Sequence, residues 1–173
     1  MSSTYALRKR LIDIARLDVG SRETTRNHGP AIGKFWPATN YRDGYDNREP
    51  YCAAGMCYWL REWLKDPEVL EAMKMTPAQA NLWRCRSAAA FGWITWARSH
   101  RLRIFNDTPE NVIHTGDIVV FDISHIGLVV DDSDGRIKTI EANTGKDGER
   151  DGDGVWEKDR RRRGIRSFIR VLT

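Results

Sequence analysis

The spacing of hydrophobic residues changes at about residue 117. Before it, apolar positions recur every three or four residues, which is typical of amphipathic helices, and residues 4–17 are predicted to form the first one. After it, short β-branched runs are separated by Asp, Ser and Gly, which indicates strands joined by turns. The predicted strands are 117–121, 125–130, 136–141, 156–159 and 165–171. Helices followed by an antiparallel sheet give the α+β class.

Residues that favour turns and helix ends divide the chain before residue 117 further. Residues 21–50 are rich in Asn, Gly, Asp and Pro and are predicted to form a loop, with one short helix near 31–35. Prolines at 67 and 77 each follow a residue that favours a helix N-cap, so new helices are expected there, and 87–98 carries a further helical pattern. A long loop in a compact domain usually lines a functional site.

The most informative residue is Cys52. Pro50 breaks the chain just before it, and a run of Ala and Gly then opens a helical pattern, which places the thiol in the first turn of a helix. Unpaired amides and the positive end of the helix dipole favour a thiolate there. Cys52 is therefore a candidate nucleophile.

Residues for a complete catalytic group follow later in the chain. A nucleophilic thiolate needs a base beside it and a third group that orients the base. His125 begins a predicted strand and is the candidate base. Glu141 and Asn143 lie two apart at the end of the next strand, so we expect both to share a face and to reach the imidazole.

Length, charge and hydropathy limit the number of domains and the classes of partner that the chain can have. The chain has 173 residues, which suits a single domain, and a net charge of +4, which allows nucleic acid, anionic lipid or an acidic cell-wall polymer as partner. Charged residues interrupt the first twenty positions, so no secretory signal is expected, and no apolar run approaches the ~20 residues of a membrane span.

No metal or cofactor is expected. The other cysteines, Cys57 and Cys85, have no zinc-ligand spacing and are predicted to be packing residues, and a calcium-like pattern at 147–153 lacks the closing glutamate. The basic run 158–163 is predicted to be a solvated surface. Core positions are expected for four tryptophans, and solvated positions for three histidines: Trp59, Trp63, Trp93, Trp96; His28, His100, His114.

Four motifs in order resemble the CHAP family of cysteine, histidine-dependent amidohydrolases/peptidases. They are PYCAA at 50–54, GDIVVF at 116–121, SHIGLVV at 124–130 and IEANT at 140–144. The resemblance implies a papain-like fold, with the nucleophile helix packed on a C-terminal antiparallel sheet, and cleavage of an amide bond in peptidoglycan.

The resemblance also implies roles for individual residues. Cys52 would be the nucleophile, His125 the general base and then acid, and Glu141 the orienting group, with Asn143 assisting. The Cys52 amide would supply one oxyanion donor, and the second donor stays unassigned. The scissile bond would be either N-acetylmuramoyl-L-alanine or a bond of the stem peptide.

The expected setting is a single CHAP-like catalytic domain, 1–173, of a phage endolysin. It would be made in the bacterial cytoplasm and would act on the cell wall after release, as a monomer, with peptidoglycan as its partner and without nucleic acid or membrane insertion. An antibacterial effector injected into rival cells is one alternative. A non-catalytic protein that binds cell wall or nucleic acid is another.

Overall fold

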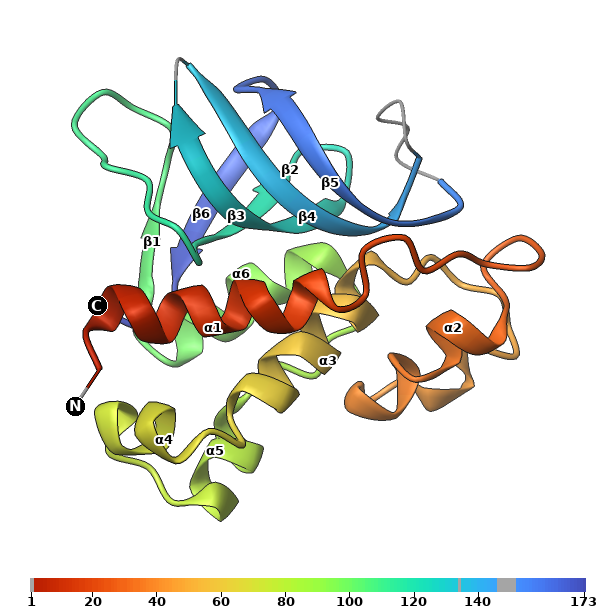
Figure 1. Ribbon diagram of the computed structural model, residues 1–173, viewed down its shortest axis with the longest axis horizontal. Coiled ribbons are helices and arrows are strands. Elements are labelled where there is room, and N and C mark those ends of the chain that lie inside the picture. Colours follow the sequence, from red (N-terminus) through yellow and green to blue (C-terminus); the bar gives the residue numbers. More distant parts are fainter. Residues whose placement is uncertain (1, 134, 146–151) are drawn as a thin grey trace.

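The α+β architecture is confirmed by the computed structural model, which describes residues 2–133, 135–145 and 152–173. Within these ranges the chain forms six α-helices, two short 3-10 helices and a six-stranded antiparallel sheet. The helices come first in the chain, and the strands follow from residue 103 onward. Figure 1 shows the sheet as one layer with helices gathered below it.

The helical part agrees with the predicted starts. Its elements are α1 Thr4–Arg16, α2 Pro30–Gly33, the 3-10 helices η1 Trp36–Ala38 and η2 Arg42–Gly44, α3 Cys52–Trp63, α4 Pro67–Met73, α5 Pro77–Trp83 and α6 Ala90–Ser99. Asp66 caps α4 by accepting from the Glu68 amide, and Thr76 and Gln79 form a reciprocal capping box at α5. The expected loop at 21–50 contains only short helices.

The sheet has the strand order β1-β6-β2-β3-β4-β5. The strands are β1 Arg103–Phe105, β2 Ile118–Phe121, β3 His125–Ser133, β4 Arg136–Thr144, β5 Gly154–Arg161 and β6 Ile165–Arg170. Five of them match predicted strands, and β1 is an additional edge strand that pairs with β6. The predicted hairpin joins β3 to β4, where Ser133 pairs with Arg136, although its residue 134 lies outside the described ranges.

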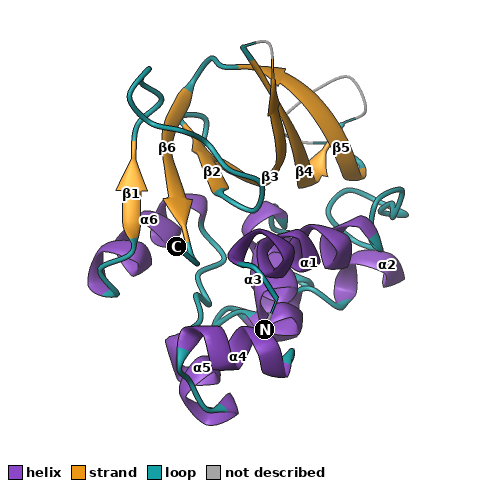
Figure 2. Cartoon of the chain, turned by 60° about the vertical axis from the view of Figure 1, so that its left-hand side comes forward, coloured by secondary structure: helices purple, strands orange, loops and turns teal. Residues whose placement is uncertain are grey.

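The main hydrophobic core lies between the sheet and two long helices. Helices α1 and α3 pack against each other, and both contact β3 and β4 (Figure 2). Trp59, Trp63 and Trp93 are completely buried, as predicted, and the indole N–H groups of the first two are satisfied by Asp18 and by the Leu7 carbonyl. Helix α3, which carries Cys52, is therefore held by packing along most of its length.

Among the basic residues of the run 158–163, only Arg161 and Arg163 are exposed, as predicted for the whole run. Lys158 is buried and donates to the Gly145 carbonyl at 2.7 Å, Arg160 pairs with Glu141, and Arg162 pairs with Asp107 and Asp132. For Lys158 and Arg160 the cause is strand alternation in β5, and Arg162 follows the end of that strand at Arg161.

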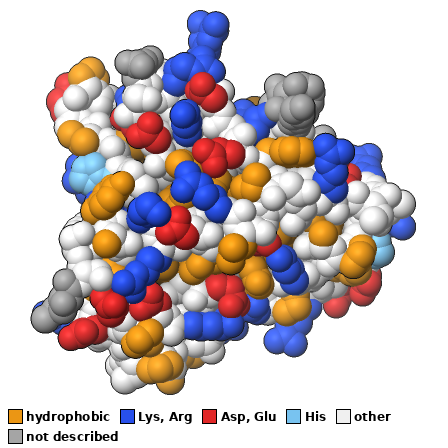
Figure 3. Space-filling model, viewed as in Figure 1, with side chains coloured by type: hydrophobic (Ala, Val, Ile, Leu, Met, Phe, Trp, Pro, Cys, Tyr) orange, Lys and Arg blue, Asp and Glu red, His pale blue; other side chains and the backbone are white. Residues whose placement is uncertain are grey.

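Surface charge is mixed on the face drawn in Figure 3, where basic and acidic side chains alternate over the helices and the sheet. No helix in the described ranges is both long and apolar enough to cross a bilayer.

Candidate active site

Cys52 is the first residue of α3, as its sequence context predicts. Tyr51 occupies the N-cap position but supplies no side-chain cap, and the Gly55 amide, which bonds to the Tyr51 carbonyl, lies three residues into the helix. The amides before Gly55, including that of Cys52, therefore have no acceptor within the helix. They form a cluster of donors beside the thiol that could stabilise negative charge.

Close packing brings this helix end to the sheet. Gly55 lies so near β4 that a Cβ at this position would be 2.8 Å from the Ala142 Cβ. A larger residue would separate the helix from the strand, so Gly55 permits the approach that places Cys52 beside β3 and β4.

His125 begins β3 and is completely buried. It follows Ser124, whose φ of 58° turns the chain into the strand. The Nε2 atom of His125 lies 2.8 Å from Glu141 Oε2. Its Nδ1 atom is buried and makes no hydrogen bond of standard geometry with the described residues, while the Cys52 side chain is close enough to interact with the ring electrostatically. One ring nitrogen is thus fixed by the carboxylate, and the other remains for the thiol.

Glu141 is completely buried, and both of its carboxylate oxygens have hydrogen-bond partners. Thr139 Oγ1 and Arg160 Nε both lie 2.5 Å from its Oε1, and a second Arg160 nitrogen lies 2.5 Å from Oε2. Space for this side chain depends on Gly127, because a Cβ there would be 2.7 Å from the Glu141 Cγ. The carboxylate is therefore held in one position by its partners and by close packing.

These contacts fix the charges of the pair. Burial alone would lower the pKa of His125, but Cys52 and Glu141 raise it from the usual 6.5 to about 9. Burial alone would raise the pKa of Glu141, but His125 and Arg160 lower it from 4.5 to about 2. An imidazolium next to a carboxylate is the favoured state near neutral pH.

Arg160 is the residue at this site that sequence reasoning missed. Besides its two bonds to Glu141, its guanidinium lies 5.0 Å from the centre of the Phe121 ring, and Phe121 stacks on His125 with ring centres 5.9 Å apart. No signal in the sequence separates Arg160 from the three arginines that follow it. A buried carboxylate such as Glu141 needs a cation or several donors, and Arg160 lies on an inward-facing position of the neighbouring strand.

Asn143 behaves differently from Glu141. It is buried with a positive φ of 55°, and a bulge between Ala142 and Thr144 interrupts the pairing with β5. The bulge breaks the strict alternation from which a shared face was expected. The described hydrogen bonds of His125 include Glu141 but not Asn143, whose Oδ1 is buried without a partner among the described residues.

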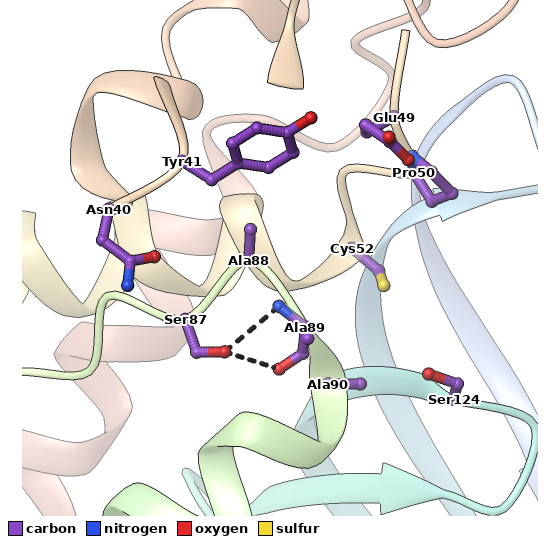
Figure 4. Close-up of a pocket in the computed structure, with 10 residues that line it drawn as sticks. All are labelled: Asn40, Tyr41, Glu49, Pro50, Cys52, Ser87, Ala88, Ala89, Ala90 and Ser124. Atoms are coloured by element: carbon purple, nitrogen blue, oxygen red, sulfur yellow. Dashed lines mark hydrogen bonds between the residues drawn. The ribbon is translucent and has the colours of Figure 1, made fainter. Parts of the chain in front are cut away.

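A cavity of about 410 Å³ opens at Cys52. Its walls come from the loop before α3, from the segment before α6 and from the residue before β3 (Figure 4). The lining residues are Asn40, Tyr41, Glu49, Pro50, Cys52, Ser87, Ala88, Ala89, Ala90 and Ser124. In Figure 4 the sulfur of Cys52 points toward Ser124, which lines the same cavity. A substrate bound there would lie directly against the thiol.

The other cysteines, His28 and the calcium-like segment were also singled out in the sequence, and none of them lines the cavity at Cys52 in the described structure. Cys57 and Cys85 are buried free thiols, and His28 stacks on Tyr45 with ring centres 4.1 Å apart. No cluster of three metal-ligating side chains occurs among the described residues. Most of the calcium-like segment 147–153 lies outside the described ranges.

The arrangement contains the side-chain groups that nucleophilic catalysis by a thiol uses. It combines a thiol at a helix start, an imidazole beside it and a buried carboxylate on the far ring nitrogen. Comparison with protein-family models finds no model that matches the chain, and no curated protein matches it in sequence.

Proposed function

We propose that the chain is a cysteine amidohydrolase with a papain-like arrangement that cleaves an amide bond of bacterial peptidoglycan. The observation that carries the proposal is the position of His125, whose Nε2 is bonded to Glu141 at 2.8 Å and whose ring interacts with Cys52 at the start of α3. Nucleophile, base and orienting group thus stand in the order that acyl transfer requires.

The reaction would run in two steps. The Cys52 thiolate attacks the carbonyl carbon, and the oxygen that becomes negative is stabilised by helix-start amides. Collapse of the intermediate breaks the C–N bond, and the amine leaves with a proton from His125, which leaves a thioester on Cys52. His125 then takes a proton from water, the hydroxide attacks the thioester, and a carboxylic acid is released as the thiolate re-forms.

The assignment of peptidoglycan as the substrate depends on the resemblance to the CHAP family. The shape of the cavity and the net charge of the chain also support it. The cavity at Cys52 is an open site bounded by loops, which suits a segment of a polymer. The net charge of +4 favours association with an anionic wall. The enzyme could serve as a phage endolysin or as an injected effector, because both settings use the same chemistry.

Nucleic-acid binding is a weaker candidate. The basic run 158–163, which offers cations for phosphate contacts, is partly paired internally, with Arg160 on Glu141 and Arg162 on Asp107 and Asp132. Cations that neutralise buried or neighbouring carboxylates are less available to phosphates.

The test is hydrolysis of purified sacculi by Cys52→Ala, with released muropeptides identified by mass spectrometry. We expect activity to disappear while the thermal unfolding midpoint changes little, because the substitution removes only the nucleophilic sulfur. Cys85→Ala is the matched control, since it removes a buried thiol that does not line the cavity. Hydrolysis by a folded Cys52→Ala at the wild-type rate would exclude the thiol mechanism.

A further inference from the structure

The cavity at Cys52 has one charged side chain among its described lining residues, Glu49. This carboxylate is exposed and has no hydrogen bond or ion pair with the described residues. The backbone is nevertheless fixed, because the Glu49 amide donates to the Gly44 carbonyl at 2.9 Å. The guanidinium of the adjacent Arg48 donates to Thr25 Oγ1 at 3.0 Å and forms no ion pair with Glu49 in the described structure.

The rest of the cavity is suited to a small, mostly apolar segment of substrate. Ala88, Ala89 and Ala90 leave room on one wall, and the Tyr41 ring forms another (Figure 4). Glu49 precedes the nucleophile by only three residues and lines the same cavity. A molecule that places a carbonyl group at Cys52 therefore also comes within reach of this carboxylate.

We propose that Glu49 is a specificity-determining residue that binds a primary ammonium group of the substrate close to the scissile amide. This inference rests on the proposed function. In a wall peptide such a group is the free side-chain amine of a diamino acid. Cross-linking converts that amine to a neutral amide, so Glu49 favours strands that are not cross-linked. The same carboxylate repels the acidic groups of the stem peptide and so disfavours binding in the opposite direction.

The test uses two soluble muropeptides that differ only at the diamino acid, whose side-chain amine is either free or acetylated. For the wild type we expect kcat/KM to be about tenfold higher for the free amine, the effect of one charge-assisted hydrogen bond in a partly open site. Glu49→Gln should make the two values converge. Asp46→Asn is the matched control, because Asp46 is exposed in the same loop, does not line the cavity and loses the same charge.

The outcomes separate this inference from the proposed function. Equal kcat/KM values for both muropeptides in the wild type, or a preference that persists in Glu49→Gln, would overturn the role of Glu49 and leave the hydrolase intact. If the folded wild type cleaves neither compound nor sacculi, the proposed function fails. Calorimetric binding of both compounds to Cys52→Ala, with and without Glu49→Gln, then decides the role of Glu49: a preference for the free amine that disappears with Glu49→Gln supports it, and equal affinities overturn it.

Discussion

The carboxylate of Glu141 should determine the upper pH limit of activity. His125 is held at a pKa of about 9 against its usual 6.5, which corresponds to about 3 kcal/mol in favour of the imidazolium, at roughly 1.4 kcal/mol for each pH unit. Burial opposes this shift, and Cys52 and Glu141 together overcome it. In the proposed mechanism, the imidazolium that would protonate the leaving amine therefore persists below about pH 9 and is lost above it.

Glu141→Gln keeps the shape of the side chain and removes its charge. An adjacent opposite charge typically moves a pKa by ~1–3 units, so we expect the alkaline limit of kcat/KM to fall by about one to two pH units. Substituting Glu141 alone leaves the half-buried Arg160 beside an uncharged group, and the cost in stability is at most about 3–5 kcal/mol, the cost of breaking a fully buried pair. The combination with Arg160→Gln removes both charges and provides a second variant with less strain.

The assay is the pH dependence of kcat/KM on a soluble muropeptide, together with an NMR titration of the His125 ring. Asn143→Ala is the control, because no hydrogen bond from His125 to Asn143 occurs in the described structure, and its alkaline limit should stay near that of the wild type. An unchanged alkaline limit in both folded Glu141 variants would refute the reasoning. A larger shift in Asn143→Ala than in Glu141→Gln would instead identify Asn143 as the orienting group.

Three further predictions concern packing, metals and stability. Gly127→Ala should lower activity and cost about 1–3 kcal/mol by overpacking, because its Cβ would be 2.7 Å from the Glu141 Cγ; wild-type kinetics would show that the carboxylate tolerates displacement. Chelation by EDTA should leave hydrolysis unchanged, whereas a loss that calcium restores would implicate the 147–153 segment. In urea unfolding, the stabilisation that Glu141 adds to the free energy of unfolding should be complete above pH 4.5 and decline toward pH 2. The stabilisation that His125 adds should be complete below pH 6.5 and decline as the pH rises through 9. A free energy of unfolding that rises from pH 6.5 to 9 would contradict this sign.

The elements with strong local signals were predictable. Proline and N-cap residues marked the starts of α4 and α5, and β-branched runs bounded by turn residues marked β2, β3 and β4. The order of Cys52, His125 and Glu141 indicated the candidate site for a similar reason, since each lies at or near the end of a predictable element. The short edge strand β1 gave no comparable signal, because three residues are too few to establish a period.

Contacts between segments that are distant in the sequence were harder to predict from the sequence. The sequence presents four consecutive arginines at 160–163 without distinguishing them, and only pairing of β5 with β4 shows that Arg160 turns toward Glu141. The bulge at Asn143 likewise depends on how β4 pairs with β5. Alternation counted along β4 alone therefore predicted that Asn143 and Glu141 would share a face of the strand and both reach His125, and it could not foresee the bulge. In both cases the deciding interaction joins residues that are not neighbours in sequence.

The close contact between Gly55 and Ala142 joins the two halves of the chain at the candidate site. The thiol comes from the helical half, whereas the imidazole, its carboxylate and the arginine come from the sheet half. Neither half alone contains a complete catalytic group. Hydrolytic activity would thus be a direct reporter of the docked state, and a chain in which α3 has separated from β4 would carry an ordinary cysteine with no base beside it.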